Sequence, residues 1–225
     1  MLNTATILSQ ETLIFKGIDA INKLGEMGLS YETLANAASN GHKMKKKKSK
    51  YAPPICKSIS FWENTIIMLR EQLVEKLGWS ICDDYNLNRT ISPRKDYSIV
   101  VSSGNANVGK NANPSTLNKK GQLSAAVVDV NNVVQLSLFP IQSSKTKKYN
   151  VERIPHWFLL YYNDGNKIWL ELSLPRQIGK DGRISSWFQR IILEPVEITS
   201  NIDVEQKIKE RKSEIEYNID ISKKQ

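Results

Sequence analysis

The sequence has few residues of the kinds that build catalytic and metal centres. It contains two cysteines, Cys56 and Cys82, and two histidines, His42 and His156. The cysteines are far apart and no other ligand stands at zinc-site spacing, so the pattern predicts neither a disulfide framework nor a metal site. One histidine lies in a lysine run and the other beside a proline, where neither is expected to activate a nucleophile. We therefore expect no catalytic residues, no metal and no cofactor.

Long hydrophobic runs are also missing. No apolar stretch approaches the roughly 20 residues that cross a bilayer. The first ten residues lack the basic start and apolar segment of a secretory signal. A cytoplasmic location is expected. Hydrophobic residues still make up 40% of the 225 residues, which is enough for a core.

Negative charge is in the minority, with 23 Asp and Glu against 32 Lys and Arg, a net charge of +9. Such an excess attracts phosphate polyanions whatever the fold, so we predict nonspecific binding to DNA. A solvated linker is the alternative interpretation of lysine runs such as residues 43–50. The residues expected to contact nucleic acid are Lys45, Lys46, Lys47, Lys48, Lys110, Lys119 and Lys120.

Hydrophobic spacing predicts an α+β fold, with a helical N-terminal segment and a long helix packed on an antiparallel sheet. Helices are expected over residues 9–24, 30–38 and 60–77, the last opened by a capping box at Ser60. The first two also fit a helix-turn-helix, although residues 31–39 offer no Arg, Lys or Gln to read base edges. Three domain regions are expected: residues 1–50 as a helical hairpin and basic linker, 51–198 as an α+β core, and 199–225 as a charged tail.

The last third of the core is expected to be a meander of strands. The Asp164-Gly165 pair predicts a tight hairpin turn, which would pair Tyr161 with Ile168. Phe158, Tyr162 and Trp169 fall on the opposite, mixed face of this hairpin. These rings can stack on single-stranded bases, but a second core face covered by the helix of Trp62 is the favoured interpretation.

The long loop over residues 104–121 contains a near match to the phosphate-binding loop. Gly104 to Lys110 follow its spacing, but Asn111 replaces the hydroxyl that binds magnesium and Pro114 blocks the helix that should follow. Nucleotide hydrolysis is therefore not expected. A loop that contacts nucleic-acid phosphates is the remaining interpretation.

Residues 135–139 read QLSLF, which resembles the pentapeptide that binds the bacterial sliding clamp. In that family of peptides the Leu-Phe pair fills an apolar pocket and the Gln amide binds a second subsite. The resemblance implies a replication clamp as partner, and it covers Gln135, Leu136, Ser137, Leu138 and Phe139. The same alternation of apolar and polar residues is also typical of a half-buried strand.

The sequence leaves three functions open. The first is a DNA-associated accessory protein that docks on the clamp, consistent with segments at residues 170–175 and 187–193 that are similar to uncharacterised mobile-element proteins. The second is a clamp-targeted, metal-dependent nuclease, whose candidate carboxylates are Asp129, Asp164 and Glu171. The third is a phage-type inhibitor of host replication that occupies the clamp pocket.

Overall fold

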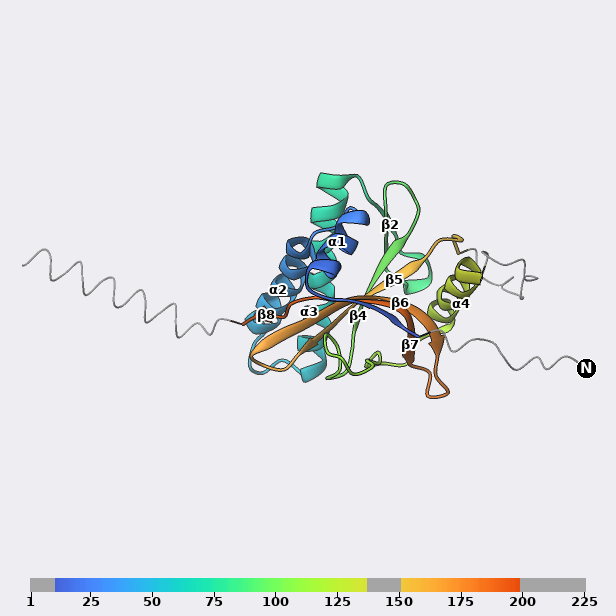
Figure 1. Ribbon diagram of the computed structural model, residues 1–225. Coiled ribbons are helices and arrows are strands. Elements are labelled where there is room, and N and C mark those ends of the chain that lie inside the picture. Colours follow the sequence, from blue (N-terminus) through green and yellow to red (C-terminus); the bar gives the residue numbers. More distant parts are fainter. Residues whose placement is uncertain (1–10, 137–150, 199–225) are drawn as a thin grey trace, which may run out of the picture.

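The computed structural model describes residues 11–136 and 151–198 (Figure 1). The α-helices in these ranges are α1 (Ile18–Glu26), α2 (Tyr31–Lys47), α3 (Pro54–Arg70) and α4 (Gln122–Leu136). A π-helical turn, Glu71–Glu75, continues α3, and a 3-10 turn covers Asp84–Asn86. The strands are β1 (Leu13–Phe15), β2 (Ser80–Cys82), β3 (Arg89–Ile91), β4 (Ser98–Ser103), β5 (His156–Asn163), β6 (Lys167–Ile178), β7 (Ile184–Ile192) and β8 (Val196–Glu197).

The strands form one sheet in the order β1-β7-β6-β5-β4-β3-β2, with β8 paired to β6. The α+β fold predicted from the sequence is confirmed. The sheet is mixed, however, because β4 runs parallel to β5 and β1 parallel to β7. A parallel pair needs a crossover connection, and the segment between β4 and β5 supplies one that contains α4.

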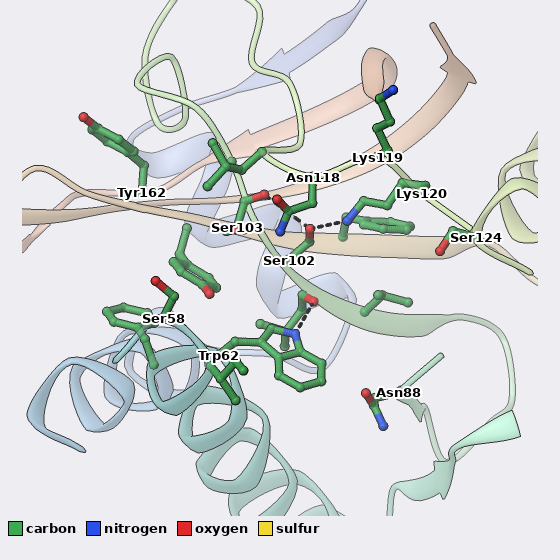
Figure 2. A pocket seen from close by; sticks show the side chains of 18 of the residues that line it. Ser58, Trp62, Asn88, Ser102, Ser103, Asn118, Lys119, Lys120, Ser124 and Tyr162 are labelled. Carbon is green, nitrogen blue, oxygen red and sulfur yellow. Dashed lines mark hydrogen bonds between the residues drawn. The ribbon is translucent and has the colours of Figure 1, made fainter. Parts of the chain in front are cut away.

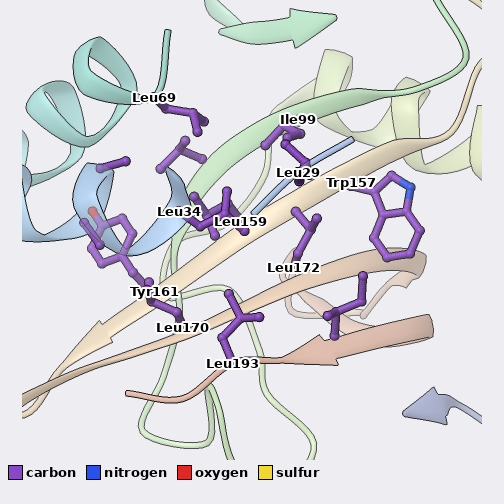
Figure 3. Packing of buried hydrophobic residues seen from close by; sticks show 14 of the residues in the cluster. Leu29, Leu34, Leu69, Ile99, Trp157, Leu159, Tyr161, Leu170, Leu172 and Leu193 are labelled. Atoms are coloured by element: carbon purple, nitrogen blue, oxygen red, sulfur yellow. The ribbon is translucent and has the colours of Figure 1, made fainter. Parts of the chain in front are cut away.

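Helices cover both faces of the sheet (Figure 1). On one face, α1, α2 and α3 pack over a large apolar cluster that includes Leu34, Leu69, Leu159 and Leu172 (Figure 3). On the other face, α4 covers a smaller cluster built around Phe158, Leu160 and Trp187. The N-terminal helices and the strands therefore share one core.

The helix α2 extends beyond the predicted end. Ser30 caps it as expected, since its hydroxyl accepts a hydrogen bond from the Thr33 N–H at 3.2 Å. The helix then continues to Lys47, so most of the lysine run is helical where a linker was one interpretation. Lysines in the last turn of a helix are stabilised by the partial negative charge of its C-terminal carbonyls.

Two predicted helix starts are wrong. The segment over residues 9–24 is divided at Gly17 (φ 54°), with β1 before it and α1 after it. The helix expected from Ser60 begins instead at Pro54, where the fixed φ of proline suits a first helical turn. Ser60 is buried in the middle of α3 and caps no helix.

The hairpin of β5 and β6 has the predicted faces and a different register. Tyr161 lies opposite Leu170, and Asn163 lies opposite Ile168, two residues from the predicted pairing. The turn is longer than expected because the Asp164 carboxylate accepts hydrogen bonds from the N–H groups of Asn166 and Lys167. A two-residue shift keeps every side chain on its face, so the predicted core face is correct.

The opposite face of the hairpin belongs to a second core, which was the favoured interpretation of the sequence. The helix that covers it is not the expected one. Phe158 and Leu160 are fully buried there, and α4 rather than the helix of Trp62 packs on them. Trp62 lies on the other side of the sheet. Asn131 holds α4 in place, since its side chain bonds the backbone N–H and carbonyl of His156 and the carbonyl of Pro175.

The close packing of α2 on α3 gives a first prediction. A Cβ added at Gly41 would lie 2.5 Å from the Phe61 carbonyl oxygen and would also meet the Thr65 hydroxyl. Because backbone cannot yield as a flexible side chain does, Gly41→Ala should lower the free energy of unfolding by about 1–3 kcal/mol. Chemical denaturation measures this change.

Gly25→Ala is the matched control for this experiment. Gly25 also lies in a helix, and nothing lies within 4 Å of the added Cβ. This substitution should stabilise the protein by about 0.5–1 kcal/mol through the better helix propensity of alanine. Equal effects of the two substitutions would show that α2 and α3 do not approach as described.

Candidate nucleic-acid interface

A buried ion pair fixes the long loop between β4 and α4 onto the sheet. The Arg190 guanidinium on β7 contacts the Glu171 carboxylate on β6, with Nη2 and Oε2 2.6 Å apart, and both side chains are almost fully buried. Arg190 also donates to the backbone carbonyls of Lys110 and Ala112. Glu171 accepts the N–H of Gly109 at 2.9 Å. The pair therefore satisfies backbone groups of the loop as well as its own charges.

The loop then passes along an open strand edge. β3 pairs with β4 through Ser98 to Val100, so residues 101–103 of β4 continue beyond that partner strand. On this side the Val101 carbonyl accepts a hydrogen bond from Trp62 Nε1 at 3.1 Å, and the Ser103 carbonyl accepts one from the Leu117 N–H. A cavity lies along this edge.

The cavity has a volume of about 620 Å³ and is bounded by α3, the edge of β4 and residues 117–121 of the loop. This size lies within the range of roughly 300–1,000 Å³ that is usual for ligand pockets. We call it the edge pocket. Figure 2 shows its wall, with Trp62 rising from α3 and Ser102 and Lys120 above the strand. Its polar and aromatic lining consists of Lys45, Ser58, Phe61, Trp62, Asn86, Asn88, Ser102, Ser103, Asn118, Lys119, Lys120, Ser124, Phe158, Tyr161, Tyr162 and Asn163.

Lys120 is the most constrained cation of the edge pocket. Its Nζ donates to Ser102 Oγ at 2.6 Å and lies 5.9 Å from the centre of the Phe158 ring. Burial lowers the pKa of Lys120 to about 8, so the amine is still mainly protonated at neutral pH. A partly buried ammonium beside a hydroxyl and a ring favours an anionic group as its neighbour.

The charges around the edge pocket are of one sign. Lys45, Lys119 and Lys120 line it, and the lining contains no Asp or Glu. Lysines that lack a carboxylate partner attract phosphate or another anion. The rings of Trp62 and Tyr162 stand beside the side-chain amides in the same lining. The pocket can therefore hold an anion together with a planar, hydrogen-bonding group.

The structure brings together some of the predicted lysines and separates others. Lys45 from α2 meets Lys119 and Lys120 from the loop at the edge pocket. Lys46 and Lys47 instead line a second hollow of about 480 Å³ beside β8, with Lys43 and His42. Two further lysines lie outside both hollows. Lys48 is exposed at the end of α2, and the Lys110 Nζ lies 4.9 Å from the Trp169 ring centre.

The loop that nearly matches a phosphate-binding motif does not have its geometry. No helix follows Lys110 until α4 begins at Gln122. The Gly109 N–H, which such a loop would direct at phosphate, donates to Glu171 instead. The Gly109 N–H is therefore not free to bind a phosphate.

The predicted clamp peptide lies only partly within the described residues. Gln135 and Leu136 form the end of α4, so this part of the segment is helical and the strand interpretation does not apply to it. Ser137, Leu138 and Phe139 lie outside the described residues. Extended binding to a clamp would require the last turn of α4 to unwind.

The residues considered for catalysis do not converge. Asp129 is exposed on α4, Asp164 lies in the β5–β6 turn, and Glu171, which the sequence allowed to be a surface residue, is buried in its ion pair. Among the described residues, no three His, Cys, Asp or Glu side chains stand close enough to share a metal ion.

One histidine does contact a serine, contrary to expectation. The ring Nδ1 of His156 lies 2.6 Å from Ser98 Oγ, but both residues are completely buried and neither lines the edge pocket. Burial, assisted by the positive charge of Arg89, lowers the pKa of His156 to about 4. The imidazole is therefore neutral at pH 7, and neither side chain is exposed to solvent. We interpret it as a structural contact.

Several residues of the edge pocket were not predicted from sequence. Trp62 was assigned only to a helix face, and Asn88 and Asn118 carried no signal because an Asn in a polar loop is ordinary. Tyr161 was assigned to the core, and it does stack on Phe61 with ring centres 4.4 Å apart while also lining the pocket. The run Asn118-Lys119-Lys120 was the one indication of a site at this place.

Comparison of the chain with protein-family models, with curated proteins and with solved structures found no match. The described helices include none that is both long and apolar enough to cross a membrane. Function must therefore be argued from the residues themselves.

The buried ion pair gives a second prediction. Glu171→Ala leaves the Arg190 guanidinium buried without its carboxylate, which should lower the free energy of unfolding by about 3–5 kcal/mol. Asp181→Ala is the control, because Asp181 pairs with Arg183 in an exposed turn where an ion pair is worth at most about 1 kcal/mol. Urea denaturation of both variants tests this, and equal losses would contradict an anchoring role for Glu171.

Proposed function

We propose that this protein is a cytoplasmic, DNA-associated accessory protein of a bacterial mobile element or phage. It docks on the replication sliding clamp through residues 135–139 and contacts DNA phosphates without reading sequence. The observation that carries the DNA-binding part is the meeting of Lys45, Lys119 and Lys120, from two segments far apart in the chain, at a pocket lined by no carboxylate. Phosphate is the anion that DNA presents in every sequence context.

The end of α2 supports the same proposal. Lys46, Lys47 and Lys48 follow Lys45 directly and are exposed. Because they are carried on a helix, except for the capping Lys48, their positions are fixed relative to the edge pocket. Exposed lysines carried around the end of a helix that borders an anion-binding pocket suit a polyanion better than a single small anion.

The clamp-docking part rests on the QLSLF segment. A short peptide with two apolar anchors is expected to bind with micromolar affinity, about 8 kcal/mol. The segment begins with the last two residues of α4, Gln135 and Leu136, so binding in extended form requires the last turn of this helix to unwind.

Replacing Leu138 and Phe139 together with Ala should weaken clamp binding by at least about 2 kcal/mol, because anchors of this kind carry most of the energy of a short peptide. Isothermal calorimetry with purified bacterial clamp measures the affinity. Ile141→Ala, just outside the pentapeptide, is the control and should bind like the unchanged protein. Unaltered binding by the double variant would remove the clamp from the proposal.

Replacing Lys45, Lys46, Lys47 and Lys48 with Gln should weaken DNA binding and flatten its salt dependence, since fewer counterions are released. Glutamine removes the charge and keeps a good helix former in α2. Fluorescence anisotropy over a series of salt concentrations gives the slope.

A charge-matched control carries Gln at four exposed cations outside both hollows: Lys76, Lys95, Arg153 and Lys180. The control should keep most of the original slope. If both variants lose affinity equally, net charge alone accounts for binding and the interface lies elsewhere.

A nuclease remains the second candidate, and one experiment separates it from the accessory protein. Labelled duplex, single-stranded and forked DNA would be incubated with the protein, clamp and magnesium or manganese. The accessory-protein proposal expects intact DNA. Cleavage that is lost in Asp129→Ala or Asp164→Ala would favour the nuclease instead.

A further inference from the structure

The edge pocket contains more than phosphate binding requires. Lysines on an open surface are sufficient for nonspecific phosphate contacts. This pocket is hollow, and its wall includes the aromatic residues Trp62, Phe158, Tyr161 and Tyr162. Phe158 and Tyr161 are buried, so the half-buried rings of Trp62 and Tyr162 provide the flat apolar surfaces on which a nucleobase can stack.

The polar groups of the wall match the edge of a base. Asn88 and Asn118 carry amides that both donate and accept, and Ser58 and Ser103 carry hydroxyls that do the same (Figure 2). Ser103 belongs to β4, Ser58 to α3, and Asn88 stands just before β3, whereas Asn118 lies on the loop next to Lys119. The wall of the pocket can therefore contact a base while Lys120 contacts its phosphate.

We propose that the edge pocket receives one unpaired nucleotide of a DNA strand, with the base against the aromatic and amide wall and the phosphate at the lysines. The proposal rests on the proposed DNA association and names the part of the DNA that is recognised. Phosphates flanking this nucleotide lie along the exposed lysines at the end of α2.

A strand is favoured over a free nucleotide because of what surrounds the pocket. Lys46, Lys47 and Lys48 lie outside the edge pocket and follow directly on Lys45, which lines it. A mononucleotide would make no use of them. A DNA strand that enters the pocket at one nucleotide carries further phosphates, which Lys48 at the end of α2 and Lys46 and Lys47 at the second hollow can contact.

Base pairing decides which DNA binds best. A paired base must be unstacked and unpaired before it can enter a pocket, which costs free energy, whereas a mismatched or single-stranded base enters at lower cost. The pocket therefore gives a preference for DNA with an unpaired base and no preference for sequence.

The experiment compares four duplexes that differ at one central position. The first three carry a correct pair, a mismatch, and an abasic site opposite the same base on the other strand. The third duplex leaves that opposite base unpaired, so a fourth, with abasic sites on both strands, removes the base altogether. Mismatched and singly abasic DNA should bind about tenfold more tightly than paired DNA. Doubly abasic DNA should bind no more tightly than paired DNA. Equal affinity for all four would overturn the proposal.

Single substitutions test whether the preference for unpaired DNA arises at the edge pocket. Asn118→Ala changes an exposed loop side chain of the pocket, and Lys120→Met removes its buried cation; both should abolish the preference for unpaired DNA. Lys110→Met removes an exposed lysine outside the pocket, and this variant should keep the preference for unpaired DNA. If loss of Lys120 disturbs folding, Asn118→Ala still tests the pocket. Thermal melting shows whether each variant is folded. A preference that survives in Asn118→Ala and in folded Lys120→Met would overturn the assignment to this pocket.

Two outcomes separate this proposal from the proposed function. Salt-dependent DNA binding without discrimination among the duplexes would overturn the nucleotide pocket and leave the DNA association standing. Absence of any salt-dependent DNA binding would overturn both. Deoxyadenosine monophosphate is included as a further probe, and binding as tight as that of mismatched DNA would identify a receptor for free nucleotides instead.

Discussion

The buried contact between Arg190 and Glu171 is the constraint on which the rest of the site depends. Two charges removed from water are tolerated only when their remaining hydrogen-bonding groups are satisfied, and here backbone groups of the β4–α4 loop complete the set. The ion pair thus attaches to the sheet a loop that has no regular secondary structure of its own. From this point the chain reaches the edge of β4, where the Leu117 N–H bonds the Ser103 carbonyl. The position of Lys119 and Lys120 follows from these two contacts.

The edge pocket is a consequence of strand order and strand length. β4 is longer than its partner β3, so its last residues pair with β5 alone and form an open edge in the middle of the strand order. An open edge exposes backbone groups that bind other chains unless they are covered. Here Trp62 from α3 and the loop cover it from opposite sides, and the space between them remains hollow. Side chains from both faces of the sheet therefore line one pocket, which explains its mixture of aromatic, amide and lysine groups.

Sequence patterns predicted the elements with strong hydrophobic periodicity. They did not predict features that depend on contacts between residues far apart in the chain. The core face of β5 and β6 was correct because alternation of apolar residues fixes a face. The predicted register of these two strands was wrong, because hydrogen bonds to the Asp164 side chain stabilise a longer turn. The lysine run was read as a possible linker because its composition is polar, whereas the packing of Gly41 against Phe61 keeps α2 helical as far as Lys47. The edge pocket was unpredictable for a similar reason, since it needs α3, β4 and the loop to meet, and no local pattern encodes that meeting.

The helix α4 connects the two proposed binding functions. Its first turn borders the edge pocket through Ser124, and its last residues are Gln135 and Leu136, the start of the proposed clamp peptide. With 15 residues at about 1.5 Å each, the helix sets these sites roughly 20 Å apart. Asn131, bonded to β5 and β6, holds the helix on the sheet, so the spacing is fixed as far as the turn that unwinds to bind the clamp. A protein held on a clamp by this peptide would keep its pocket near the encircled DNA. Weak, nonspecific contacts would then act at a high effective concentration. A pocket that selects unpaired nucleotides can therefore be effective with modest affinity of its own.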